Sequence, residues 1–114
     1  MNKPSTCSFE DFEKADIRIG TIREALPFPE AIKPAYKLVV DFDPALGIRR
    51  SSAQLTARYQ PEDLVGRQVL AVVNFPAKQI GPFLSECLVL GAVEGKNVYL
   101  LQPDSTVTNG SRIR

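Results

Sequence analysis

Apolar and polar residues alternate most regularly between Tyr36 and Asp43, where apolar side chains occupy every second position. A period of two residues predicts a half-buried strand with Lys37 on its outward face. The segment 16–26 alternates in the same way but changes phase at Gly20. We therefore expect a long strand that bends or bulges at this glycine and serves both sides of a small barrel.

Four further segments predict strands. Residues 48–55 form a more polar strand, in which Arg50, Ser52 and Gln54 share one face by the alternation of a pleated sheet. Two near-continuous apolar runs predict the most buried strands of a closed barrel, and a last strand follows a turn at Gly95. These three segments are 69–75, 87–93 and 98–101.

Two short helices are predicted from their end signals. Ser8 followed by Asp11 predicts an N-cap, and the helix should extend to Lys14 and press Phe9 and Phe12 onto the core. A second helix should begin at Pro61 and end at Gly66. Pro is favoured at a first helical position, and acidic residues are favoured in the first turn.

The order of strands and helices favours an all-β domain with short helices. A helix between the third and fourth antiparallel strands is typical of the OB-fold, a small five-stranded barrel that binds oligonucleotides on one face. An SH3-like barrel and a β-sandwich remain alternatives. With 114 residues we expect one domain over 1–114, with a helical extension at 1–15 and a tail at 102–114. Val107 and Ile113 should pack back on this domain or dock on another copy.

The segment 76–86 lies between two apolar strands and is rich in Pro, Gly, Lys and Gln. A simple core hairpin seldom needs such a linker, so we interpret its surroundings as a recognition rim. The residues of this rim are Asn74, Lys78, Gln79, Ser85 and Glu86. Recognition is therefore favoured over catalysis.

Charge is unevenly distributed along the chain. The net charge is +1, but segment 31–81 contains seven Lys and Arg residues against four Asp and Glu residues. A local basic face of this kind can bind phosphate, although a solvated surface gives the same pattern. Arg49 and Arg50 face opposite sides of their strand, so at most one lies on a binding face. Tyr36 and Phe75 are interpreted as core residues ahead of stacking surfaces, and the role of Phe83 is left open.

Composition argues against most enzyme chemistry. The sequence contains no His, which removes the usual general base and most nucleophile systems and zinc sites. Asp41 and Asp43 share a strand face, but solvated carboxylates are the simpler interpretation. Cys7 and Cys87 are too far apart for a metal-ligand motif, and no glycine-rich nucleotide loop is present. We therefore predict no catalytic residue, metal or cofactor.

Segment 1–8 has no apolar core of a signal peptide, and no apolar run approaches the roughly 20 residues that span a bilayer. These features predict a cytoplasmic protein without membrane insertion. A disulfide is not expected in such a compartment, and Cys87 should be a buried thiol.

Five linked motifs strongly resemble the tRNA-binding domain family, which includes the C-terminal domain of methionyl-tRNA synthetases and dimeric tRNA-binding proteins. These motifs occupy 16–22, 28–38, 51–56, 74–80 and 85–91. Within this family the chain is similar to the branch of export-related chaperones of the CsaA type. The segments that carry this second similarity are 33–37, 50–54, 73–76, 100–104 and 109–110.

The resemblance implies an OB-fold homodimer whose terminal extensions wrap the partner subunit, with Val107 and Ile113 in docking roles. It also implies tRNA-facing positions at Lys33, Asn74, Lys78 and Ser85. With the basic and polar positions of the two central strands, the predicted tRNA-binding set is Lys33, Lys37, Arg50, Ser52, Asn74, Lys78 and Ser85. Candidate peptide-binding residues are Phe75, Ile80 and Phe83.

Two functions follow from these expectations. The first is a secretion chaperone that binds unfolded preproteins or peptides as a homodimer, associates with the secretion machinery and retains tRNA-binding capacity. The alternative is a structure-specific tRNA-binding protein that acts in translation. Near-neutral net charge favours the first function, since a dedicated RNA-binding domain usually has a large basic excess.

Overall fold

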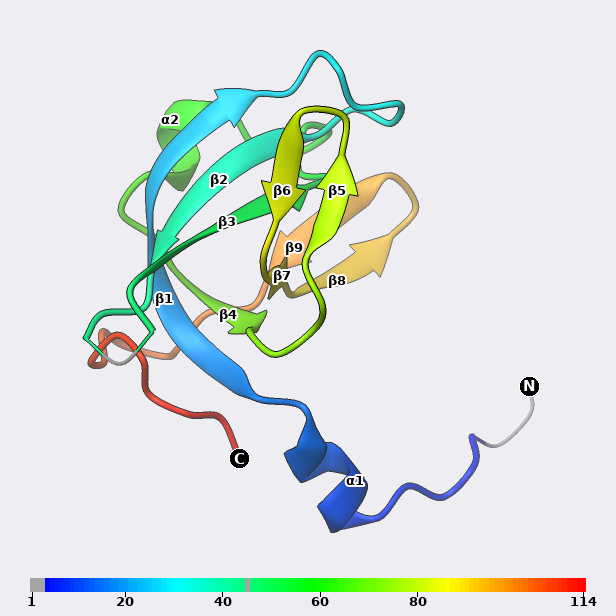
Figure 1. Ribbon diagram of the computed structural model, residues 1–114, viewed down its shortest axis with the longest axis vertical. Coiled ribbons are helices and arrows are strands. Elements are labelled where there is room, and N and C mark those ends of the chain that lie inside the picture. The colour runs from blue at the N-terminus through cyan, green and yellow to red at the C-terminus, as the bar shows by residue number, and fades with distance from the viewer. Residues whose placement is uncertain (1–3, 45) are drawn as a thin grey trace.

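The computed structural model describes residues 4–44 and 46–114. Most elements are strands, and the two helices are short (Figure 1). In chain order the elements are α1 (Phe9–Lys14), β1 (Ile17–Pro27), β2 (Tyr36–Asp41), β3 (Ile48–Ala53), α2 (Pro61–Leu64), β4 (Gln68–Val72), β5 (Lys78–Ile80), β6 (Phe83–Ser85), β7 (Leu88–Val89), β8 (Gly91–Glu94) and β9 (Asn97–Leu100).

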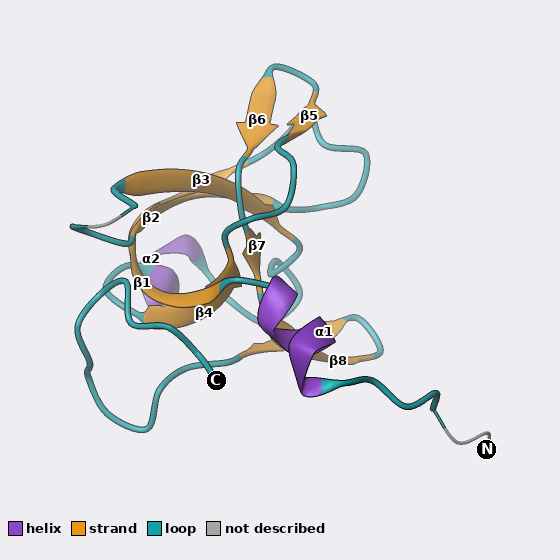
Figure 2. Ribbon diagram, turned by 60° about the horizontal axis from the view of Figure 1, so that its bottom comes forward, coloured by secondary structure: helices purple, strands orange, loops and turns teal. Residues whose placement is uncertain are grey.

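Five antiparallel strands in the order β3-β2-β1-β4-β7 form a nearly closed barrel (Figure 2). The first half of β1 pairs with β4 and its second half pairs with β2. Between β3 and the chain before β7, Glu86 N–H donates to the Arg50 carbonyl at 2.7 Å, and the Ser51 hydroxyl donates to the Cys87 carbonyl at 2.9 Å. The predicted OB-like fold is therefore confirmed.

The irregular point of β1 is at Arg23, where the register with β2 shifts between Ile22 and Glu24. The prediction of a bulge at Gly20 was therefore wrong in its position, whereas the expectation that this strand serves both sides of the barrel is confirmed by its pairing with β4 and β2. Gly20 serves close packing instead, because a Cβ there would lie 2.7 Å from side-chain atoms of Phe42 and Val40. The change in the apolar alternation therefore coincides with a glycine that lets β1 pack closely against the side chains of Val40 and Phe42.

The core fills the barrel with alternate side chains of β1, β2 and β4. Ile22, Leu38, Val40 and Val69 are fully buried. Helix α2 covers one end of the barrel with Leu64, which is also fully buried (Figure 1). The predicted start of this helix at Pro61 is confirmed.

Two of the predicted strands are shorter than expected. Strand β4 ends at Val72, and the run 87–93 divides into β7 and β8 instead of forming one buried strand. Leu88 and Val93 are 45% and 75% exposed, so the expectation that this run is buried was wrong. The reason is that the chain leaves the barrel here and forms a separate hairpin, β8–β9.

The segment 76–86 is a hairpin and not an irregular loop. Its strands β5 and β6 pair with Lys78 opposite Ser85 and Ile80 opposite Phe83. Gly81, with φ of +54°, makes the turn between them. This hairpin projects from the barrel (Figure 2).

Helix α1 has the predicted cap, because Ser8 Oγ accepts a hydrogen bond from Asp11 N–H at 3.0 Å. Phe9 and Phe12 are nevertheless 65% and 38% exposed, with ring centroids 6.5 Å apart. The expectation that they pack on the core was wrong. The helix extends away from the barrel, so its aromatic rings contact each other (Figure 1).

Candidate functional site

A cavity of about 910 Å³ lies between the loop after β1, the end of β3 and hairpin β5–β6. We call it the cleft. Six of the predicted binding residues line it, so the fold brings together segments that are far apart in the sequence. These six are Lys33, Ser52, Phe75, Lys78, Ile80 and Ser85.

Lys37, Arg50, Asn74 and Phe83 do not line the cleft. Lys37 Nζ lies 5.6 Å from the ring centroid of Phe28, and the Arg50 guanidinium lies 5.4 Å from that of Phe83. The two cations therefore lie against a small aromatic cluster beside the cleft. Their assignment to tRNA binding remains a prediction.

The three aromatic candidates have different environments. Tyr36 is buried as predicted, and its hydroxyl donates to the Tyr59 carbonyl at 2.7 Å. Phe83 is also buried, where it packs on Phe28 with ring centroids 5.3 Å apart. Phe75 is 51% exposed at the cleft, so its interpretation as a core residue was wrong. Phe75 is thus the aromatic side chain that a ligand in the cleft can reach directly.

A second cavity of about 700 Å³ adjoins the cleft, and we call it the side cavity. Lys33, Ser52 and Gln54 line both cavities. Hairpin β8–β9 forms the far wall of the side cavity with Val93 and Lys96. The end of β3 is therefore the common floor of a longer recess.

The surface around the cleft combines exposed apolar groups with available positive charge. Ile32 is fully exposed and Leu88 is 45% exposed. Within the described residues, neither Lys33 nor Lys78 forms an ion pair. Apolar contact, aromatic stacking and attraction of anionic groups are therefore all available to a ligand at one place.

Besides the backbone bond from Glu86 N–H to the Arg50 carbonyl, two side-chain acceptors connect the end of hairpin β5–β6 to the outer edge of β3. Glu86 Oε1 accepts from Arg50 N–H at 3.0 Å, and Ser85 Oγ accepts from Ser52 N–H at 3.0 Å. The Glu86 carboxylate also lies 3.8 Å from the Arg50 guanidinium. The Glu86 carboxylate is therefore paired with groups of the protein itself.

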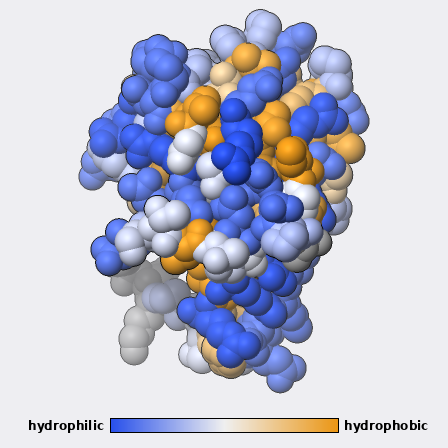
Figure 3. Space-filling model, turned by 90° about the vertical axis from the view of Figure 1, so that its left-hand side faces the viewer, coloured by the Kyte–Doolittle hydropathy of each residue, from blue (hydrophilic) through white to orange (hydrophobic). Residues whose placement is uncertain are grey.

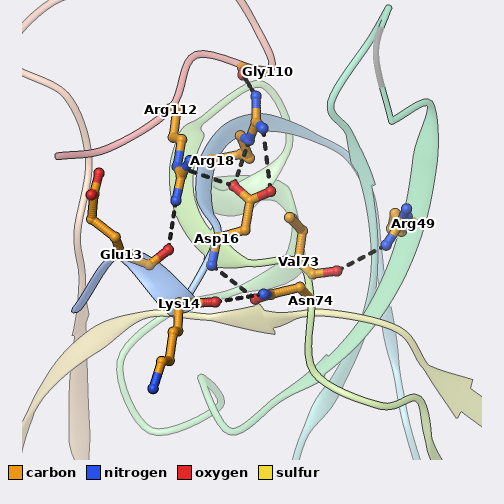
Figure 4. Close-up of polar contacts among 9 residues, drawn as sticks. All are labelled: Glu13, Lys14, Asp16, Arg18, Arg49, Val73, Asn74, Gly110 and Arg112. Carbon is orange, nitrogen blue, oxygen red and sulfur yellow. Dashed lines mark hydrogen bonds and ion pairs between the residues drawn. The ribbon is translucent and has the colours of Figure 1, made fainter. Parts of the chain in front are cut away.

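We call the segment 73–77, between β4 and hairpin β5–β6, the arm. Asn74 lies in it, and both the oxygen and the nitrogen of its side-chain amide form hydrogen bonds (Figure 4). Its Nδ2 donates to the Lys14 carbonyl at 2.7 Å, and its Oδ1 accepts from Asp16 N–H at 2.8 Å. Asn74 therefore fixes the junction between α1 and β1. Its predicted contact with tRNA remains untested.

The same junction binds the C-terminal tail. Asp16 pairs with Arg18 at 2.6 Å and with Arg112 at 3.7 Å, while Arg18 also donates to the Gly110 carbonyl (Figure 4). The hydrogen bond from Arg18 lowers the pKa of the Asp16 carboxyl, against a smaller opposing effect of burial. We call Asp16, Arg18, Asn74 and Arg112 the terminal latch.

Hydrogen bonds hold the backbone of the tail on its own barrel. They are made with the backbone of β1 and with the Gln68 side chain of β4. Ile113 N–H donates to the Ile17 carbonyl at 2.8 Å, and Gln68 bonds both backbone groups of Val107. The Val107 side chain remains 40% exposed. A docking role for Val107 and Ile113 on a partner stays a prediction.

Sequence reasoning missed the latch because its members are separated along the chain. Asp16 and Arg18 gave only a strand signal, and Arg112 lies 94 positions after Arg18. The buried thiol of Cys87 was found, and burial raises its pKa to about 11. Apolar sequence context identified that residue, whereas no local signal identifies an ion pair between the two chain ends.

The face on the side of β1 and α2 is mainly hydrophilic, with small and separate apolar patches (Figure 3). In the described part of the chain, no helix has the length and apolar character needed to cross a membrane. Among the same residues, no cluster of three or more Cys, Asp or Glu side chains is placed to hold a metal ion.

The family model described as "Putative tRNA binding domain" matches residues 17–112. The chain belongs to this family. It is 35% identical over 109 residues to the methionine–tRNA ligase of Francisella tularensis, and 37% identical over 106 residues to that of Pyrococcus horikoshii. The chain covers only 16% and 14% of the lengths of these two relatives.

The chain is also similar to two solved structures of CsaA chaperones. The protein from Bacillus anthracis is 51% identical, with a TM-score of 0.90, and the alignment covers 96% of this chain and 100% of that one. The protein from Picrophilus torridus is 48% identical, with a TM-score of 0.89 and the same coverage. At the level of the family, the chain is thus related both to chaperones and to tRNA-binding domains.

Proposed function

We propose that this protein is a non-catalytic chaperone of the secretion pathway, which binds unfolded preproteins or peptides in the cleft and also binds tRNA. The observation that carries the proposal is the exposed apolar surface of Ile32, Phe75 and Leu88 around one recess. Large exposed apolar groups gathered at a cavity are typical of a binding site. The cytoplasmic location and the association with the secretion machinery are parts of this proposal.

The relatives support a chaperone assignment because the CsaA proteins of two organisms share about half of their residues with this chain over their full lengths. The cleft adds the physical reason. An unfolded polypeptide exposes apolar side chains that a folded protein buries, so an open apolar recess distinguishes the two states.

Fluorescence anisotropy with a reduced and unfolded polypeptide tests this function. Binding at micromolar concentrations is expected, and the Phe75→Ala variant should bind about tenfold more weakly because it loses exposed apolar area at the cleft. Val65→Ala is the matched control, since Val65 is 51% exposed but lies outside both cavities. Equal affinities of the two variants, or no binding of any unfolded polypeptide, would contradict the proposal.

A tRNA-binding protein that acts in translation is the second candidate. Lys33 and Lys78 favour it, because they line the cleft and form no ion pair among the residues that the structure describes. Each phosphate neutralised by a lysine contributes about 0.9 to the slope of log affinity against log salt in a duplex region. Lys33→Ala and Lys78→Ala should each lower that slope by about 1. Arg23→Ala is the control, because Arg23 is paired with Asp41 at 3.1 Å. A slope that does not depend on these lysines would remove this candidate.

We also propose that the protein is a homodimer in which Val107 and Ile113 contact the partner. Val107 is exposed although its backbone is fixed to Gln68, so its side chain is presented outward by an ordered tail. Sedimentation equilibrium should show a dimer, and Val107→Asp should shift it toward monomer. A monomer at all accessible concentrations would exclude this assembly.

A further inference from the structure

The outer edge of β3 is only partly covered. In an antiparallel pair, successive residues direct their backbone groups alternately toward the partner strand and away from it. The backbone groups of Arg50 and Ser52 point away from β2, because their N–H groups donate to the side chains of Glu86 and Ser85. The Arg50 carbonyl also has a partner, the N–H of Glu86 at 2.7 Å.

Beyond Ser85 this edge is open. Among the hydrogen bonds of the described residues, the carbonyl of Ser52 and the N–H of Gln54 have no partner. Both residues line the cleft and the side cavity, so the two groups lie at the floor of the recess. The recess therefore offers one backbone acceptor and one backbone donor, in the pattern of an unpaired strand edge.

We propose that an extended polypeptide binds in this recess by adding a short strand to the end of β3, with main-chain hydrogen bonds to Ser52 and Gln54. The proposal rests on the proposed polypeptide-binding function and specifies how that site recognises its ligand. Such strand addition obtains affinity from main-chain bonds that every sequence can make. It thus explains how one recess accepts segments of different sequence.

The side chains around the recess define the preferred class of segment. Alternate side chains of a bound strand point to opposite sides. Phe75 and Leu88 provide apolar contacts, while Lys33 and Lys78 provide positive charge. Segments that combine apolar residues with acidic residues should therefore bind most tightly.

An RNA strand fits the open edge less well than a polypeptide does. Phosphate oxygens only accept hydrogen bonds, so in RNA a donor for the Ser52 carbonyl must come from a ribose 2′-OH or a base N–H, and these groups do not alternate with acceptors at the spacing of a strand. A polypeptide supplies an N–H and a C=O at the spacing of a neighbouring strand. The backbone groups of the floor thus favour a polypeptide, and the lysines alone do not distinguish the two ligands.

Backbone N-methylation tests the proposal directly. The probe is the tightest-binding twelve-residue peptide selected from a random library, synthesised with N-methyl groups at even positions, at odd positions or at none. Strand addition predicts that one N-methylated form loses at least tenfold in affinity while the other changes less than threefold, because only alternate N–H groups face β3. Equal losses in both forms, or no loss in either, would overturn the proposal.

Amide hydrogen exchange provides the second readout. The Gln54 amide should exchange at least tenfold more slowly when the unmethylated peptide is bound, and the Asp104 amide, outside both cavities, should not change. An unprotected Gln54 amide in the complex would contradict strand addition while leaving peptide binding itself intact. If no library peptide binds, the proposed function fails first. Protection of Gln54 by a single-stranded oligonucleotide instead would assign the floor to RNA and overturn the inference.

Discussion

The terminal latch and the cleft contain similar residues but use them in opposite ways. In the latch, Asp16, Arg18 and Asn74 direct their polar atoms at partners within the protein. At the cleft, Lys33 and Lys78 have no ion-pair partner among the described residues, and apolar side chains face outward. Polar groups paired within the protein and polar groups free for a ligand therefore belong to two separate sets of residues on the same small barrel.

The difference shows that residue type alone does not identify a binding residue. Asn74 and Lys78 both belong to the predicted rim, yet Asn74 is bonded to the backbone of α1 and β1, whereas Lys78 lines the cleft. A polar residue whose groups are all paired contributes to the free energy of folding. A polar residue with free groups beside a recess is available to a ligand.

The largest effect on stability should come from replacing Phe83 of hairpin β5–β6 by alanine, in comparison with the same replacement of Phe75 in the arm. Phe83→Ala should lower the free energy of unfolding by about 3 kcal/mol, because a buried ring is removed from its contact with Phe28. Phe75→Ala should change it by less than about 0.5 kcal/mol, since Phe75 is half exposed. Urea denaturation measures both, and equal losses would show that Phe75 is also a packing residue.

The next effect concerns Asn74. Asn74→Ala removes two hydrogen bonds to backbone groups and should lower the free energy of unfolding by about 1.5 kcal/mol. Lys78→Ala is the control from the cleft and should leave stability unchanged within about 0.5 kcal/mol. The same urea titrations apply. A destabilised Lys78→Ala with an unaffected Asn74→Ala would reverse the contrast between latch and cleft.

A smaller effect is expected from competition between polypeptide and tRNA for the cleft. If polypeptide and tRNA both use Lys33 and Lys78, added tRNA should weaken peptide binding about tenfold at low salt, and this competition should disappear as salt screens the lysines. Anisotropy of a labelled peptide with increasing tRNA measures it. Simultaneous binding without mutual effect would place the two ligands on separate surfaces.

The smallest effect is the acid response of the latch. The hydrogen bond from Arg18 holds the pKa of the Asp16 carboxyl below its ordinary value in the folded protein. The stabilisation is therefore complete above the pKa of the unfolded chain, about 3.9, and is lost as pH falls through the lower folded pKa. Asp16→Asn should remove this part of the acid sensitivity. Urea midpoints between pH 6 and pH 2.5 that fall in parallel for both proteins would contradict the assignment.

Much of the barrel could be predicted from the sequence because its strands have a local signal. The alternation at Tyr36 to Phe42 gave the strand and its buried face, and Pro61 gave the start of α2. The run at 87–93 was misinterpreted, because apolar residues that leave the barrel and form an exposed hairpin look the same in sequence as those of a buried strand.

The cleft was only partly predictable. Lys78 and Ser85 were identified from the composition of the rim and Lys33 through the family resemblance, and all three line one cavity. The open edge at Ser52 and Gln54 could not be found in this way, since it consists of backbone groups whose partners depend on the whole sheet. The sequence gives the chemistry of each side chain directly, whereas unpaired backbone groups at a strand edge are known only once the fold is known.

Asn74 directly precedes Phe75, so the residue that fixes the junction between α1 and β1 is adjacent to the aromatic ring at the mouth of the recess. The C-terminal tail reaches the same junction through the ion pair of Arg112 with Asp16. Fusions or truncations at either end of the protein should therefore disturb this junction, and with it the position of Phe75, before they disturb the barrel.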